Sequence, residues 1–288
     1  MKIDTLVQDI NAFVLKNHED AAPFGGGIGG EIKNNYVRQL QKRDKVRDEK
    51  TLYFSELGDV CPRRQWYKHH QPNIGESLRS ETKIKFMYGD MLESLVLQLA
   101  RDAGHDVSKE QEGVEYVDSN SGWRVRGRID AVIDGHVVDV KSVTKYSEMK
   151  FHDGLKDDPF GYYGQLNGYA SVLKSKDMGF LTIQKELGHI NYFQFIPDGE
   201  VFEHTVQRAV KNVDRNTPVE ERIAAVPQSA TSKNKKLTAT CSYCAFKKQC
   251  FPELRAFAYS NKVEFLTEVV DTPRVPEIDL NKVESDES

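Results

Sequence analysis

Apolar residues recur at helical spacing in some stretches of the chain and alternate with polar residues in others. This pattern predicts helices over 4–16, 31–50, 81–103, 162–173 and 200–213. Strands are expected between 106 and 143 and over 180–185 and 190–196. Elements in this order predict an α/β fold with a mixed central β-sheet flanked by helices. The glycine run 25–30 has no preceding strand and no following Lys-Ser or Lys-Thr pair, so a connector is favoured over a nucleotide-binding loop.

The segment 124–143 is the best defined part of the pattern. Asp134-Gly135 within it is a preferred two-residue turn of a β-hairpin, because a type I′ turn needs a positive φ at both positions. The register that follows from this turn places Asp130 directly opposite Asp139, on the same face of the hairpin.

Two carboxylates with Cβ atoms roughly 5 Å apart repel each other and destabilise a sheet. A divalent cation between Asp130 and Asp139 would remove this repulsion, and Mg²⁺ prefers hard carboxylate oxygens. Lys141, two residues beyond Asp139 on the same strand face, would orient or activate a metal-bound water. The alternative is an exposed hairpin of mixed charge, in which Lys141 and nearby arginines merely neutralise the aspartates.

The composition is typical of a soluble globular protein, with 39% hydrophobic and 29% charged residues. A formal net charge of −4 argues mildly against a general nucleic-acid binder. Basic residues nevertheless cluster at 42–45, 63–64, 124–128 and 233–236. The predicted DNA contacts are Arg63, Arg64, Arg126 and Arg128. Each cluster can equally be a solvated surface.

Two of the predicted helices carry further polar residues that suit such a site. Glu93 shares a helix face with Gly89, where a glycine would allow close approach to the sheet. Glu93 would then supply a third carboxylate. Gln165 and Tyr169 are also four residues apart on one helical face. Taken alone, each of these is an ordinary helix-surface residue.

The order of these motifs resembles the PD-(D/E)XK nuclease superfamily, and more narrowly its RecB-like branch with a glutamine–tyrosine motif. The matching residues, within 53–250, are Gly89-x-x-x-Glu93, Gly127-Arg128-Ile129-Asp130, Asp139-Val140-Lys141 and Gln165-x-x-x-Tyr169. The resemblance implies a restriction-endonuclease-like core. The chain departs from the family pattern at Ile129, where a proline is usual, and at Glu93, where many RecB-like relatives have histidine.

The resemblance also implies a role for each matched residue. Metal ligands for Mg²⁺ or Mn²⁺ would be Glu93, Asp130, Asp139 and the carbonyl of Val140. Lys141 would be the catalytic lysine, while Gln165 and Tyr169 would organise the site and the DNA. The implied activity is an exonuclease that hydrolyses phosphodiester bonds on single-stranded or frayed DNA ends.

The chain has four cysteines: Cys61, followed much later by Cys241, Cys244 and Cys250. Three of them lie close together and none is left over, which favours a metal site over disulfides. Four thiolates suit both tetrahedral zinc and an iron–sulfur cluster. One cysteine ahead of the nuclease motifs and three behind them resemble the AddB-type and CRISPR-associated RecB-like exonucleases. This resemblance implies a 4Fe–4S cluster in preference to zinc.

These features divide the chain into a helical segment, 1–50, a nuclease domain closed by four cysteines, 51–260, and an acidic, disordered tail, 261–288. Two other functions stay open: a non-catalytic DNA-binding or structural subunit of a recombination or helicase–nuclease complex, and a zinc-stapled nuclease or interaction module. A helicase, recombination or integrase partner is compatible with the sequence, and the oligomeric state is open. The chain has no apolar run of membrane-spanning length and does not start with a secretory signal. The expected location is therefore the cytoplasm, that of the host if a phage or a CRISPR locus encodes the protein.

Overall fold

The computed structural model describes residues 2–16, 28–40, 48–77, 80–260 and 262–279. The chain forms two compact units: Met1–Gly58 with Arg79–Val210, called the first unit, and Asp59–Leu78 with Lys211–Ser288, called the second unit. The predicted domain limits at 50 and 260 do not coincide with these units. No helix in the described ranges is both long enough and apolar enough to cross a membrane.

Helices and strands alternate in the first unit. Its helices include η1 (Ile3–Thr5), α1 (Leu6–Val14), α2 (Ile28–Leu40), α3 (Phe54–Leu57), α5 (Ser80–Asp102), α6 (Lys145–His152), α7 (Tyr162–Val172) and α8 (Gly199–Val213). Its strands include β1 (Thr51–Tyr53), β2 (Val107–Ser108), β3 (Gly113–Val117), β4 (Arg124–Arg128), β5 (Ala131–Ile133), β6 (His136–Val143), β7 (Met178–Gln184) and β8 (Ile190–Phe195).

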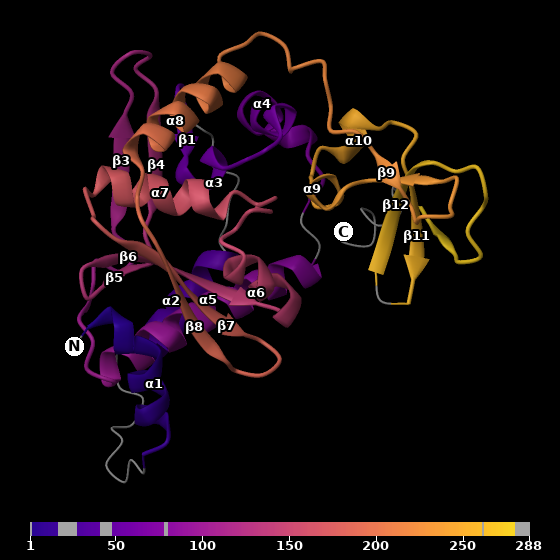
Figure 1. Ribbon diagram of the computed structural model, residues 1–288. Helices are drawn as coiled ribbons and strands as arrows, with labels where there is room; N and C mark the ends of the chain where they lie inside the picture. The colour runs from indigo at the N-terminus through magenta and orange to yellow at the C-terminus, as the bar shows by residue number, and fades with distance from the viewer. Residues whose placement is uncertain (1, 17–27, 41–47, 78–79, 261, 280–288) are drawn as a thin grey trace. The chain divides into compact units, whose positions relative to one another are not determined.

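The strands of the first unit form two sheets (Figure 1), a three-stranded sheet of order β1-β4-β3 and a five-stranded sheet of order β2-β5-β6-β7-β8. In the larger sheet β6 and β7 run parallel, and the other neighbouring strands are antiparallel. The predicted fold, a mixed β-sheet flanked by helices, is confirmed.

The two faces of the five-stranded sheet pack against different helices. Val138 and Val140 of β6 belong to one core with buried residues of α1 and α5. On the other face Phe180 of β7 packs against Phe151 of α6, with ring centroids 5.2 Å apart. Because neighbouring residues of a strand point to opposite faces, Asp139 lies on this second face, beside α7.

The predicted β5–β6 turn is confirmed. Asp134 and Gly135 have φ values of 48° and 87°, and the strand register is the predicted one. The strand before the turn, however, is not continuous. It breaks between Arg128 and Ala131, because β4 pairs with β1 and β3 in the smaller sheet. Asp130 therefore lies in the break and not in a ladder position opposite Asp139.

Some predicted boundaries also differ. Helix α2 begins at Ile28, so the last glycines of the predicted connector are helical, whereas 25–27 and 41–47 lie outside the described residues. Helix α6 was not predicted. Its buried side consists of Glu148 and Phe151, and one apolar residue leaves little helical periodicity to detect.

The second unit contains short helices and a separate antiparallel sheet. Its helices include α4 (Pro62–His70), η2 (Pro72–Ile74), α9 (Ala239–Ser242) and α10 (Lys247–Cys250). Its strands include β9 (Val226–Pro227), β10 (Lys235–Lys236), β11 (Arg255–Tyr259), β12 (Lys262–Glu268) and β13 (Glu277–Ile278), in the order β13-β11-β12-β10-β9. Figure 1 shows α9 and α10 beside this sheet, and one core joins Leu237, Phe251 and Phe265.

The expectation of a disordered tail from 261 onward is wrong for its first part. Residues 262–266 of strand β12 pair with β11, and Phe265 is buried opposite Ala256. Alternating Val263 and Phe265 give this strand an apolar face, which the acidic composition of the tail concealed. Residues 280–288 lie outside the described part of the chain.

Candidate active site and cysteine pocket

Three carboxylates predicted as metal ligands come together in the first unit. Asp139 comes from β6, Asp130 from the break between β4 and β5, and Glu93 from α5. The negative charges of Asp139 and Glu93 both act on Asp130, and that of Asp139 acts on Glu93. The site therefore combines a strand, a strand end and a helix that are far apart in the sequence.

Each aspartate has a defined partner. One carboxylate oxygen of Asp130 accepts a 2.8 Å hydrogen bond from the backbone N–H of Val140. Asp139, which is only 3% exposed, forms an ion pair with the ammonium of Lys141. The side-chain amide of Gln165 lies 3.5 Å from the other oxygen of Asp139, at the limit of a hydrogen bond.

Burial and mutual repulsion alter the protonation of this cluster. Burial, reinforced by the charges of Asp139 and Asp90, raises the pKa of Glu93 to about 7. Burial and the charges of Asp139 and Glu93 raise the pKa of Asp130 well above its usual value. Crowded carboxylates of this kind attract positive charge, and a bound cation would favour their ionised forms.

Lys141 supplies part of that positive charge. Burial by itself would lower the pKa of Lys141, but attraction to Asp139 and Asp130 outweighs burial and raises it. Lys141 is therefore an ammonium ion at neutral pH. Its nitrogen also lies 5.0 Å from the centroid of the Tyr162 ring, a distance at which a cation is attracted to the ring face.

Two residues of this neighbourhood were missed in the sequence. Tyr162 lies one helical turn before Gln165, and that spacing was the available signal. Gln111 donates a 2.7 Å hydrogen bond from its side-chain amide to Glu93. Gln111 lies in the turn between β2 and β3, where no sequence pattern marks it.

Tyr169 packs over the backbone of the Gly127-containing motif. Its hydroxyl forms hydrogen bonds with the backbone of Arg128 and the side chain of Gln165, and burial raises its pKa. A Cβ atom on Gly127 would lie 2.3 Å from this hydroxyl oxygen. Gly127 is therefore required for Tyr169 to approach. Gly89 is different, because a Cβ there would lie 3.7 Å from the hydroxyl oxygen of Ser142 in ordinary contact, so the expectation that Gly89 permits close packing is wrong.

Replacing Gly127 with alanine is expected to destabilise the protein by about 1–3 kcal/mol, because the new methyl group overlaps the Tyr169 side chain. Urea denaturation would measure the change in the free energy of unfolding. Gly113→Ala is the matched control in the neighbouring strand β3, since a Cβ there meets no atom within 4 Å. Equal stability of the two variants would contradict the proposed contact.

The arrangement is compatible with metal binding but is not yet that of a metal-bound site. Across the described ranges, no group of three or more His, Cys, Asp or Glu side chains is already placed to hold a metal ion. Asp139 is paired with Lys141, and one oxygen of Asp130 is bound to the backbone of Val140.

The predicted DNA-binding arginines fall into two groups. In the first unit Arg126 pairs with Glu115 at 2.6 Å and with Asp48 at 3.1 Å, while Arg128 is exposed at the end of β4. Arg63 and Arg64 belong to the second unit, and their side chains form hydrogen bonds with other residues of that unit.

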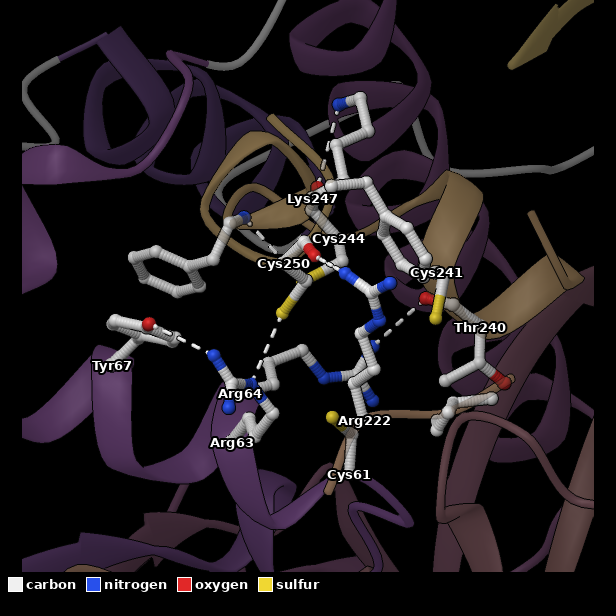
Figure 2. Close-up of a pocket in the computed structure, with 13 residues that line it drawn as sticks. Cys61, Arg63, Arg64, Tyr67, Arg222, Thr240, Cys241, Cys244, Lys247 and Cys250 are labelled. Carbon is white, nitrogen blue, oxygen red and sulfur yellow. Dashed lines mark hydrogen bonds between the residues drawn. The ribbon is translucent and has the colours of Figure 1, made fainter. Parts of the chain in front are cut away.

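All four cysteines line one pocket of the second unit (Figure 2). Cys61 directly precedes α4, Cys241 lies in α9, and Cys250 ends α10. Cys244 lies between these last two helices and accepts a hydrogen bond at its sulfur from the backbone N–H of Phe246, 3.4 Å away. All four are free cysteines.

Two arginines of α4 hold the pocket together. Arg63 donates from Nε to the sulfur of Cys250 at 3.3 Å and from Nη1 to the carbonyl of Val219 at 2.6 Å. Arg64 makes two 2.6 Å hydrogen bonds to the carboxylate of Asp59. These internal bonds favour a structural role over the predicted DNA contact for both arginines.

Burial controls the protonation of the thiols. It raises the pKa of Cys61 and Cys241, and it raises the pKa of Cys244 to about 11. These thiols are therefore protonated at neutral pH in the metal-free protein. A metal that binds them has to displace the protons, so its affinity rises with pH.

Comparisons with known proteins place the chain in a family. Solved structures with related folds include SSO0001, with 16% identity and a TM-score of 0.47 over 77% of this chain and 96% of that one. They also include the alkaline exonuclease LHK-Exo from Laribacter hongkongensis, with 10% identity and a TM-score of 0.35 over 63% of this chain and 91% of that one. The complex of LHK-Exo with dAMP gives 11% identity and a TM-score of 0.37, over 56% and 89%. No curated protein matches the sequence. The sequence model of the PD-(D/E)XK nuclease superfamily matches residues 37–251, which is most of the chain, and the chain belongs to that superfamily.

Proposed function

We propose that this protein is a Mg²⁺- or Mn²⁺-dependent DNA exonuclease with its active site at Glu93, Asp130, Asp139 and Lys141. The observation that carries the proposal is the crowding of three carboxylates, which raises the pKa of Glu93 and Asp130, next to the Lys141 ammonium group. Such a cluster is costly to a fold unless a cation binds it. The chain also belongs to a nuclease superfamily, which supports hydrolysis of nucleic acid as the reaction at this site.

The donor set suits a hard divalent cation. Glu93, Asp130 and Asp139 would hold it through carboxylate oxygens, with the carbonyl of Val140 as a further ligand. When bound, the cation polarises the phosphate and lowers the pKa of its attached water. Asp139 would exchange part of its contact with Lys141 for the cation.

The side chains around the carboxylates have separate tasks. Lys141 carries its positive charge beside Asp139, so it would stabilise negative charge that develops on the phosphate. Gln165 orients Asp139, and Tyr169 fixes the backbone of Arg128 just before Asp130. The Tyr162 ring holds the Lys141 ammonium in position.

We also propose that the four cysteines bind a 4Fe–4S cluster. All four line one pocket of the second unit as free cysteines. Four thiolates suit a 4Fe–4S cluster and tetrahedral zinc alike, and the resemblance of the cysteine arrangement to that of iron–sulfur nucleases favours the cluster. The guanidinium groups of Arg63 and Arg64 would offset the negative charge of the thiolate-bound cluster.

End-labelled DNA tests the nuclease proposal. Linear single-stranded DNA is expected to be shortened from an end in the presence of Mn²⁺, faster than blunt duplex DNA, and circular single-stranded DNA is expected to survive. Blocking one end at a time gives the polarity, and Asp139→Asn prepared in parallel excludes a contaminating nuclease.

The same assay separates the alternatives. Cleavage of the circle would make the protein an endonuclease. DNA binding without hydrolysis under any divalent metal would support the non-catalytic subunit.

A further inference from the structure

We infer that Gln111 is a positioning residue that holds the Glu93 carboxylate in the orientation required for metal binding. The inference rests on the proposed function, because it takes Glu93 as a ligand. It assigns a role to a residue outside the motifs that the sequence revealed.

Gln111 touches both sides of the carboxylate cluster. Its side-chain amide donates to one oxygen of Glu93 at 2.7 Å, and its backbone N–H donates to the carbonyl of Asp130 at 3.2 Å. A single turn residue thus connects the helix that carries Glu93 to the strand break that carries Asp130. This hydrogen bond involves one oxygen of Glu93, and the other oxygen would be the one that binds a cation.

The chemistry of the amide suits this task. Glu93 lies near the negative charges of Asp139 and Asp90. A hydrogen bond from a neutral donor fixes one oxygen of its carboxylate and adds no positive charge that would compete with a metal ion. Residues that orient metal ligands in this way typically alter metal affinity 10- to 100-fold when they are removed.

Gln111 has a backbone conformation that glycine can adopt without strain. Its φ is 52°, in the left-handed region that glycine adopts freely and a glutamine adopts with strain. Lys109 of the same turn also has a positive φ, of 54°, so this conformation belongs to the turn. The role of Gln111 rests on its two hydrogen bonds, to Glu93 and to the carbonyl of Asp130.

The strained backbone makes a decisive variant possible. Gln111→Gly removes the amide and relieves the strain together, so its melting temperature is expected to equal or exceed that of the wild-type protein. Its affinity for Mn²⁺, measured by calorimetry without DNA, is expected to fall about 10- to 100-fold. Hydrolysis at low Mn²⁺ should fall in parallel and recover as Mn²⁺ is raised.

Two control variants make the result specific. Gln98 lies on α5, the helix that carries Glu93. Its side-chain amide donates a 2.8 Å hydrogen bond to Asp102 at an exposed position. Gln98→Ala is therefore expected to bind Mn²⁺ as the wild-type protein does. Glu93→Gln is expected to weaken Mn²⁺ binding at least as much as Gln111→Gly.

The outcomes separate the two levels of the proposal. If Glu93→Gln weakens Mn²⁺ binding and Gln111→Gly leaves it unchanged, the positioning role is wrong and the metal site stands. If the wild-type protein binds no Mn²⁺, or Glu93→Gln binds it normally, the proposed site fails and the role of Gln111 fails with it.

Discussion

Lys141→Ala is expected to lower the rate of DNA hydrolysis by about 100- to 1000-fold at saturating Mn²⁺, the usual effect of removing one charge-stabilising group from an active site. Among the described residues, Lys141 is the cation whose charge acts on both Asp130 and Glu93 in the strongest interactions. Without it, the site loses the ammonium group that would offset negative charge on the phosphate. Mn²⁺ affinity should be retained or increased, because Asp139 loses a competing partner.

The same substitution should make folding depend on metal. Removing one partner of a buried ion pair destabilises a protein by up to about 3–5 kcal/mol, because the other charge stays buried. The melting temperature of Lys141→Ala should therefore fall in EDTA and recover in Mn²⁺. Lys145→Ala, at an exposed position on α6, is the control and should change neither rate nor stability. Wild-type activity of Lys141→Ala would remove Lys141 from the mechanism.

Cys61→Ser is expected to remove the bound metal and to loosen the second unit. Cys61 precedes α4, whereas the other three cysteines lie in 241–250, so the metal would join two distant parts of the sequence within this unit. A ligand bound only to the folded state stabilises it by about 4 kcal/mol at a thousand times its dissociation constant. A loss of this size should appear in urea denaturation and as a lower soluble yield.

Iron content and visible absorption identify the metal in this experiment. The wild-type protein should be brown and contain about four irons per chain, as a 4Fe–4S cluster requires. Cys61→Ser should be colourless, and Ser242→Ala, beside Cys241 but with its hydroxyl bound to the carbonyl of Thr238, should keep its colour. A colourless wild-type protein with one zinc per chain would contradict the 4Fe–4S cluster, but the metal would still link Cys61 to the cysteines in 241–250. Unchanged stability of Cys61→Ser would contradict this stabilising link.

The hairpin shows which structural features could be predicted from the sequence. The turn at Asp134-Gly135 depends on the φ preferences of two adjacent residues, so its conformation and register followed from local chemistry. The break after Arg128 depends on pairing with β1, a strand far earlier in the chain. Alternation of apolar and polar residues does not reveal such a partner, so the hairpin was predicted as continuous.

The candidate site shows the same division. Glu93, Asp130 and Asp139 belong to motifs whose order could be recognised, and the structure brings them together. Gln111 belongs to no motif and reaches Glu93 from the turn between β2 and β3. A single sequence contains no signal for a contact of this kind.

The second unit was the least predictable part. Strands β9, β10 and β13 contain two residues each, too few to show alternation. Arg63 and Arg64 looked like a basic surface cluster, because the carbonyl of Val219 that Arg63 binds lies far along the chain. The internal hydrogen bonds of both arginines depend on tertiary contacts, not on local composition.

The break at Asp130 also determines how mutations there should be interpreted. The Asp130 carboxylate accepts the backbone N–H of Val140 at 2.8 Å, and thereby takes the place of the backbone acceptor that an unbroken strand would offer. Asp130→Ala would remove a proposed metal ligand and would also leave the Val140 N–H without its acceptor. Loss of activity in this variant would therefore not show whether catalysis or folding had been damaged. Asparagine keeps one acceptor oxygen of the same reach, removes the charge and replaces the other oxygen with an NH₂ donor. At this position the same side chain supports the backbone of β6 and serves the proposed reaction.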